Sequence, residues 1–277
     1  MTRIGRLPRS LRGSVVFLSA LILVAIAAPL LAPYSPSDPL GIVLLKSKPP
    51  SLAHPFGTDL MSRDVLSRVL YGAQVSLAVA VASVFVALLV GTLFGAIAAL
   101  AGGVVDGIMM RLLDLLLAIP RLLVLLAIIA LWDRVELPAL ILLLGFTGWY
   151  DLARMIRSEV QALLGRDFVL AARASGVKRR RLLRRHLLPH LMPVLAVSAT
   201  LGIANAITLE AGLGYLGLGV QPPIASWGSI MQDGMGVVRT QWWLTLFPGL
   251  ATVLAVLACN ALGDALRDAF TTEQVHG

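Results

Sequence analysis

The strongest constraint on the fold is a series of long, nearly uncharged apolar runs that recur along the chain. The runs cover residues 14–32 and, approximately, 76–100, 105–132, 137–156, 194–209 and 244–262. A helix needs about 20 apolar residues to cross the hydrocarbon core of a bilayer. Only 14% of the 277 residues are charged and 58% are hydrophobic, whereas soluble domains carry about 25% charged residues. The sequence therefore predicts an all-α membrane protein with about six transmembrane helices.

Basic residues gather in two segments, and their positions predict the topology. Segment 1–13 holds Arg3, Arg6, Arg9 and Arg12. Ten of the 23 basic residues lie between residues 154 and 185, at Arg154, Arg157, Arg166, Arg173, Lys178, Arg179, Arg180, Arg181, Arg184 and Arg185. Loops rich in Lys and Arg stay in the cytoplasm, so both segments are expected there. The proline-rich segment 33–72 is then an external loop, and the tail 271–277 and both termini are cytoplasmic.

The first apolar run admits two interpretations, a signal peptide or a first membrane helix. A cleaved signal has an apolar core of about 7 to 15 residues. The run at 14–32 is longer and is followed by many others. It is therefore interpreted as the first transmembrane helix.

The basic segment 166–190 is expected to form two short helices. Ala171, Ala172 and Ala174 favour the first helix, Gly176 marks a turn, and residues 178–186 favour the second. Small side chains let another protein come close, whereas a cationic helix face suits anionic lipid headgroups. A basic run without stacking aromatic residues is weak evidence for RNA binding. The residues alone leave lipid contact, partner docking and RNA binding open, in that order of preference.

The same segment resembles a known family motif. It reads Ala171, Ala172, three residues, Gly176, nine residues, and then His186, Leu187, Leu188 and Pro189. This order is similar to the coupling motif of permease subunits in ABC importers, whose short helices sit in a groove of the ATP-hydrolysing subunit. That motif usually has Glu before the two alanines, where this chain has Leu170. The docking residues implied by the resemblance are Leu170, Ala171, Ala172, Gly176, His186, Leu188 and Pro189.

Three further stretches narrow the resemblance to permeases of dipeptide, oligopeptide and nickel importers. The first is similar to the external loop of that family and comprises residues 54–59 (HPFGTD) and 63–68 (RDVLSR), with Tyr71, Gly72, Ser76 and Leu77. Ser62 stands where the family usually has Gly. Residues 213–222 with Trp227 and Gly228 resemble the last external connector, and residues 260–269 resemble the closing segment. The tail after Phe270 departs from the pattern.

The resemblance implies a type I ABC importer permease architecture, with a permease domain at residues 73–270 that contains the coupling segment 166–190. The implied partners are a second homologous permease subunit, two ABC ATPase subunits, an extracytoplasmic solute-binding protein and membrane lipid, with no nucleic acid. The implied location is the inner membrane of a prokaryote. The implied cargo is a dipeptide, an oligopeptide or a nickel chelate.

Several patterns that could signal chemistry are interpreted as structural. Gly212, Gly214 and Gly217 spell GxGxxG, but a dinucleotide site needs a preceding strand. These glycines are instead expected to permit close packing or a re-entrant turn. His186 and His190 have the spacing of metal ligands on a helix, but a proline lies between them and no acidic residue is near, so no metal site is expected.

The sequence predicts no chemistry within the chain itself. It contains no GxxxxGK[ST] loop for nucleotide phosphates. The apolar runs lack the chains of carboxylates and histidines typical of proton-coupled pumps, and Arg111 and Asp114 are expected to form a local ion pair. Catalytic, cofactor and metal sites are all predicted to be none, so the chain is expected to be a transport subunit. A passive channel and a membrane-embedded enzyme are the alternatives.

Overall fold

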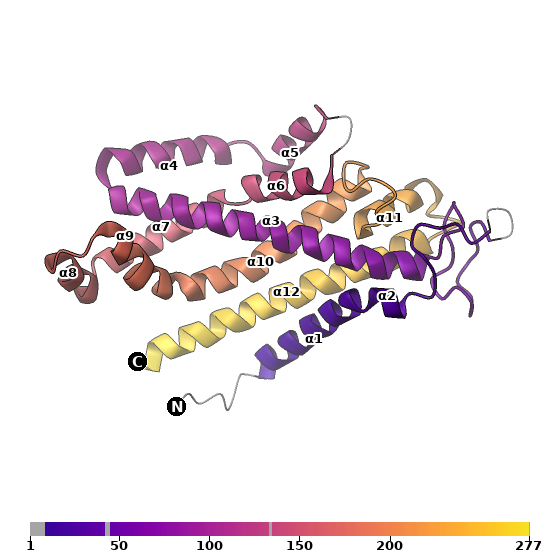
Figure 1. Ribbon diagram of the computed structural model, residues 1–277, viewed down its shortest axis with the longest axis horizontal. Helices are drawn as coiled ribbons and strands as arrows, with labels where there is room; N and C mark the ends of the chain where they lie inside the picture. The colour runs from indigo at the N-terminus through magenta and orange to yellow at the C-terminus, as the bar shows by residue number, and fades with distance from the viewer. Residues whose placement is uncertain (1–8, 42–44, 133–134, 277) are drawn as a thin grey trace.

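The structure is a computed structural model and describes residues 9–41, 45–132 and 135–276. It is an elongated bundle of helices that run mostly along its long axis (Figure 1). Helices α8 (Asp167–Ala174) and α9 (Arg179–Leu182) lie at one end, here termed the basic end. Residues 33–41 and 45–64 and helix α11 (Trp227–Gly234) lie at the opposite end, here termed the loop end.

Three helical units are individually long and apolar enough to cross a membrane. They are α3 (Val65–Ala101), α12 (Trp243–His276, with its candidate span at Trp243–Phe270) and a continuous helix, Arg179–Tyr215, that ends in α10 (Leu188–Tyr215). Helix α1 (Arg9–Ile26) is a shorter apolar helix, and α2 (Ala28–Leu31) continues it after a short break.

Two further units are bent pairs of helices. Helices α4 (Gly103–Leu117) and α5 (Arg121–Ile129) meet at 73°, and α6 (Leu137–Thr147) and α7 (Tyr150–Leu164) meet at 43°. With each pair counted as one span, the structure has up to five candidate spans, and α1 corresponds to the remaining predicted run. Pro120 lies at this first bend, where proline lacks an N–H and disfavours the helical conformation of the residue before it.

Helix boundaries differ from the apolar runs because polar residues extend the helices beyond the membrane-length cores. Helix α3 begins at Val65 rather than near residue 76, since the Asp64 side chain accepts a hydrogen bond from the Ser67 N–H and caps the helix. Helix α10 begins at Leu188 and α12 continues to His276. The runs marked the apolar centres of these helices and missed their ends.

Small residues let the helices approach closely. Helix α3 packs along α6, α7 and α10. A Cβ atom on Gly95 would overlap the carbonyl oxygen of Ala153 in α7, and one on Gly145 of α6 would lie 2.7 Å from Cβ of Val86. Such close backbone contact is a main source of stability between membrane helices, where lipid removes the usual hydrophobic driving force.

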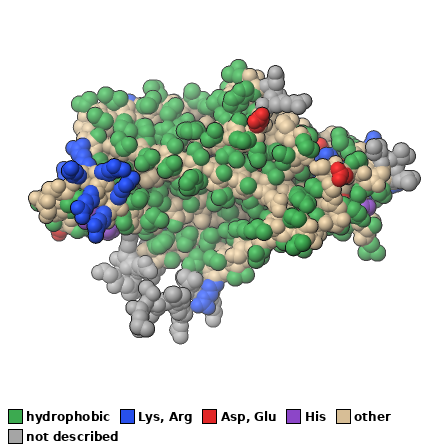
Figure 2. All heavy atoms as spheres, viewed as in Figure 1, with side chains coloured by type: hydrophobic (Ala, Val, Ile, Leu, Met, Phe, Trp, Pro, Cys, Tyr) green, Lys and Arg blue, Asp and Glu red, His purple; other side chains and the backbone are tan. Residues whose placement is uncertain are grey.

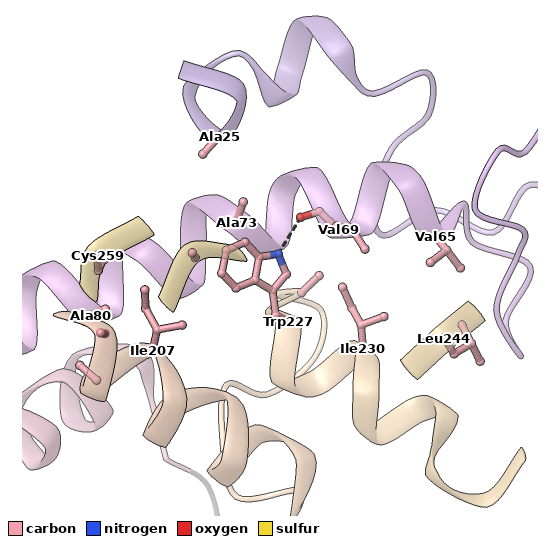
Figure 3. Packing of buried hydrophobic residues seen from close by; sticks show 14 of the residues in the cluster. Ala25, Val65, Val69, Ala73, Ala80, Ile207, Trp227, Ile230, Leu244 and Cys259 are labelled. Carbon is pink, nitrogen blue, oxygen red and sulfur yellow. Dashed lines mark hydrogen bonds between the residues drawn. The ribbon is translucent and has the colours of Figure 1, made fainter. Parts of the chain in front are cut away.

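The core toward the loop end is built around Trp227. Its indole Nε1 donates a hydrogen bond to the backbone oxygen of Val69 at 3.1 Å (Figure 3). Ile207 from α10 and Ile230 from α11 lie on either side of the ring in this view. The cluster therefore joins α3, α10 and α11.

The outer surface is strongly apolar along the middle of the molecule. Figure 2 shows hydrophobic side chains over most of one face and a group of Lys and Arg side chains at the basic end. Many large apolar side chains are exposed, among them Phe85 at 67% and Leu115 at 69%. An apolar surface of this extent is typical of a protein that is surrounded by lipid.

A buried network of charged residues holds the loop end together. Asp59 is fully buried and accepts hydrogen bonds from Nε of Arg63 and Nη1 of Arg68, both at 2.6 Å. Nη1 of Arg68 also donates to Asp233 of α11 at 2.7 Å. His54 lies 2.9 Å from the capping carboxylate of Asp64. The motif at residues 54–68 therefore joins the loop to the start of α3 and to α11.

Candidate functional site

The predicted coupling segment lies at the basic end and is anchored by a small apolar cluster. It comprises α8, α9 and a π-helical turn, η1 (Leu183–Leu187), that leads directly into α10. Val169, Leu182 and Leu187 are at most 2% exposed. They pack in one cluster with Ala96 and Ala99 of α3 and Leu152, Ile156 and Val160 of α7. The segment is therefore in firm contact with the ends of two long helical units.

Gly176 ends α8 in a left-handed turn. Its φ is +75°, its N–H donates to the Arg173 carbonyl at 3.0 Å, and the Val177 N–H donates to the Ala172 carbonyl at 3.1 Å. This pair of bonds is the Schellman motif, which favours glycine at the left-handed position. The predicted arrangement of two short helices around a turn at Gly176 matches the observed one. Pro189 is accommodated at the start of α10, because the π turn before it changes the hydrogen-bond spacing.

The predicted docking residues differ in exposure. Leu170 is 48% exposed, Ala171, Gly176 and Pro189 are also exposed, and Ala172, His186 and Leu188 are half-buried. A Cβ atom on Gly176 would meet nothing within 4 Å. Leu170, Ala171 and Gly176 therefore form an accessible surface of small and apolar residues on α8 and its turn.

The two histidines of the segment have structural contacts. Nδ1 of His190 donates to the His186 carbonyl oxygen at 2.6 Å, and the His190 ring stacks on Phe168 with centroids 4.8 Å apart. The stack ties α8 to the start of α10. Around it, the basic side chains of this segment are largely exposed and form the group visible in Figure 2.

A second candidate site is a cavity of about 700 Å³ at the two helix breaks. Its wall includes residues on both sides of the α4–α5 and α6–α7 bends and one face of α10. The polar residues in its lining are Arg121, Thr147, Tyr150, Asp151, Ser198 and Asn205. A smaller adjoining pocket extends to Ser83, near the middle of α3. The cavity thus lies part way along the bundle.

Arg121 is the central charged group of this cavity. Its Nη2 donates to the Leu144 carbonyl at 2.7 Å and its Nε donates to Thr147 Oγ1 at 3.2 Å. A Cβ atom on Gly148 would lie 2.9 Å from Nη2, so glycine leaves room for the guanidinium. The Gly148 N–H bonds to Gly145 instead of Leu144. Arg121 therefore satisfies a carbonyl that the break in α6 exposes.

Sequence reasoning did not single out these cavity residues. A signal was nevertheless present, because Arg121 and Asp151 are ionisable residues within apolar runs, and such residues at membrane depth are usually functional. The α6–α7 bend was also not predicted, since no proline marks it. The expected ion pair between Arg111 and Asp114 is wrong, because Asp114 pairs with Nη2 of Arg154 in α7 at 2.7 Å.

The glycine pattern 212, 214, 217 has the expected structural role at two positions. A Cβ atom on Gly214 would lie 2.7 Å from the Cα of Gly228 in α11, so the two backbones touch. Gly217 has a φ of +80° just beyond the end of α10. Gly212 has open space around it.

Comparison with known proteins identifies the family. Residues 91–273 match the model of the binding-protein-dependent transport system inner membrane component. A putative peptide permease protein of Brucella suis is 45% identical over 263 residues, covering 92% of this chain and 84% of that protein. The dipeptide transport system permease protein DppC of Bacillus subtilis is 38% identical, covering 90% of this chain and 77% of that protein.

A solved structure supports the same architecture. The chain is similar to a subunit of the MetNI methionine ABC transporter in an inward-facing conformation, with a TM-score of 0.56 and 19% sequence identity. The alignment covers 72% of this chain and 96% of that one. The predicted type I importer permease fold is thereby confirmed. Sequence and fold together show that the chain belongs to the family of binding-protein-dependent transport system inner membrane components.

Proposed function

We propose that the chain is a permease subunit of an ATP-driven importer of dipeptides or oligopeptides and forms half of the translocation pathway. Relatives that cover most of its length are permease subunits of peptide transport systems. The observation that carries the proposal is the coupling segment, which exposes Ala171, Gly176 and Pro189 of the family motif and packs firmly against α3 and α7. Its partners are a second homologous permease, two ATPase subunits and an extracytoplasmic binding protein.

The coupling segment gives this function a physical route. The ATPase docks on Leu170, Ala171, Ala172 and the turn at Gly176, with His186, Leu188 and Pro189 on the following turn. Movement of α8 and α9 is passed through the apolar cluster to α7, whose start lines the cavity, and to α3, which lines the adjoining pocket. A conformational change is driven only when ATPase and cargo contact its two states differently. The segment and the cavity supply those two separate contact regions.

Co-purification tests this function. The tagged chain, extracted from its native host in mild detergent, is expected to bring down a second permease and an ATPase. Deletion of its gene is expected to abolish uptake of a radiolabelled dipeptide, and restoring the gene is expected to restore it. Isolation of the chain alone, with peptide uptake unchanged by the deletion, would contradict the proposal. Partner-independent conductance would instead favour a passive channel.

A further inference from the structure

The mid-bundle cavity contains two opposite charges that do not neutralise each other. Arg121 lies at the start of α5 and Asp151 at the start of α7, and both line the cavity. The guanidinium bonds to Thr147 and Leu144 and forms no ion pair with Asp151. Asp151 is exposed and accepts no hydrogen bond from any described residue. Charged side chains at membrane depth are costly, and they are retained mainly where they serve function.

The guanidinium of Arg121 is held in place with part of its donor capacity free. A guanidinium has five N–H groups. One on Nη2 binds the Leu144 carbonyl and that on Nε binds Thr147, while Nη1 has no partner among the described residues. The two existing bonds fix the plane of the group. A planar guanidinium with free N–H groups is well suited to a carboxylate.

The other polar groups of the wall suit a peptide. Asn205 is exposed on α10. Ser198 lies two turns before it on the same face of the helix, and its hydroxyl has no partner among the described residues. An amide and a hydroxyl can pair with a peptide bond, which both donates and accepts. A cavity of about 700 Å³ lies within the usual range of small-molecule sites, about 300 to 1,000 Å³. Helix breaks commonly form the substrate sites of transporters.

We propose that this cavity is a binding site for a short peptide with free termini, in which Arg121 binds the terminal carboxylate and Asp151 binds the terminal ammonium. The two charges select a zwitterion, because a simple anion would be repelled by Asp151 and a simple cation by Arg121. Asn205 and Ser198 bind the peptide backbone between the termini. The inference rests on the proposed function and adds to it a site within the permease that recognises the cargo after the binding protein has released it.

The test separates charge from structure at each position. The complete importer, with its second permease, ATPase and binding protein, is reconstituted in proteoliposomes, and uptake of radiolabelled dialanine is measured beside ATP hydrolysis. Arg121→Gln keeps a donor near the position of Nε, beside Thr147, but loses the charge and the Nη2 bond to Leu144, whereas Arg121→Lys keeps the charge. Asp151→Asn and Asp151→Glu are the corresponding pair. The controls are Arg111→Gln on α4 and Glu159→Gln on α7, both outside the cavity lining.

Both charge-removing variants are expected to lower uptake about tenfold or more, since a bond between charged groups is being lost. Stimulation of ATP hydrolysis by the loaded binding protein is expected to persist, and the charge-keeping variants are expected to retain more uptake than their partners. Uptake within twofold of the parent in Arg121→Gln and Asp151→Asn would overturn the site, as would better uptake by Arg121→Gln than by Arg121→Lys. A parent importer that hydrolyses ATP but carries no peptide would overturn the proposed function itself.

Discussion

Gly176 combines a left-handed backbone with open space around the position of a Cβ atom. The backbone needs a residue that tolerates a φ of +75°, and a Cβ atom added here would meet no other atom of the chain within 4 Å. Steric contact at this Cβ position would therefore come from a docked partner. The two properties can be separated by the choice of substitution.

Gly176→Trp is expected to uncouple ATP hydrolysis from uptake. The indole would occupy the surface at which the ATPase is proposed to dock, whereas Gly176→Asn adds little bulk and asparagine tolerates the left-handed region. Gly176→Asn controls for the loss of glycine, and Gly176→Ala, which shares the left-handed strain of the tryptophan variant but adds only one methyl group, controls for strain. The measurement is dipeptide uptake per ATP hydrolysed, with membrane abundance checked by immunoblot. Normal uptake by Gly176→Trp would rule out the docking role.

Asp59 is expected to be the most sensitive charged residue of the loop end. It is fully buried and binds two arginines, so Asp59→Asn leaves buried positive charge with less compensation. Breaking a buried pair in this way costs about 3 kcal/mol of stability or more. Asp38→Asn, on an exposed residue of the same external segment, is the control and should have little effect. Thermal unfolding midpoints in detergent compare the two, and equal midpoints would contradict the assignment.

At the scale of helices, stability depends on where glycine allows two backbones to meet. Helices α3 and α7 touch at Gly91 and Gly95, and α10 and α11 touch at Gly214 and Gly228. In each case the nearest atoms on the opposite helix include backbone atoms, which cannot rotate away as a side chain can. These contacts set how closely the helices pack.

Gly95→Val is expected to destabilise the bundle by about 1 to 3 kcal/mol, the usual cost of overpacking. The new side chain would meet the Ala153 carbonyl, the Arg157 N–H and Ile156 in α7. Gly107→Val on α4 introduces the same side chain into a helix with open space around it, and so controls for helix propensity. Thermal unfolding of the purified chain in detergent measures both. A larger loss of stability in Gly107→Val would contradict the close contact.

At the scale of the whole molecule, the two ends differ in charge, and this difference predicts the orientation in the membrane. The basic end carries the exposed arginines of α8 and α9, and the positive-inside rule places such segments in the cytoplasm. The prediction is that both termini are cytoplasmic and that residues 45–64 lie outside.

Cysteine labelling tests this orientation. Leu52→Cys at the loop end is fully exposed and Arg180→Cys lies on α9; the native Cys259 is 1% exposed and can be replaced by alanine. A membrane-impermeant maleimide is expected to label Leu52→Cys in intact spheroplasts and Arg180→Cys only after permeabilisation. The reverse pattern would show the opposite orientation.

Much of this architecture could be predicted from the sequence because lipid imposes one simple rule, that a crossing segment is helical and apolar. The apolar runs, the Pro120 bend and the turn at Gly176 follow from that rule and from the properties of single residues. The cavity did not follow, because it depends on how α4, α5, α6, α7 and α10 rotate against one another. The break at Gly148 depends on Arg121, which lies far from it in the sequence, and the Asp114–Arg154 pair similarly joins two helices.

The position of Arg121 couples ligand binding in the cavity to the conformation of the bent helix pair. One planar group both satisfies the Leu144 carbonyl at the break in α6 and lines the cavity. A ligand that binds the guanidinium therefore strengthens or weakens the hydrogen bond from Arg121 to the Leu144 carbonyl, which lies at the break between α6 and α7. Occupancy of the cavity and the shape of the bent helix pair are thus thermodynamically linked, and each shifts the other by the same coupling free energy.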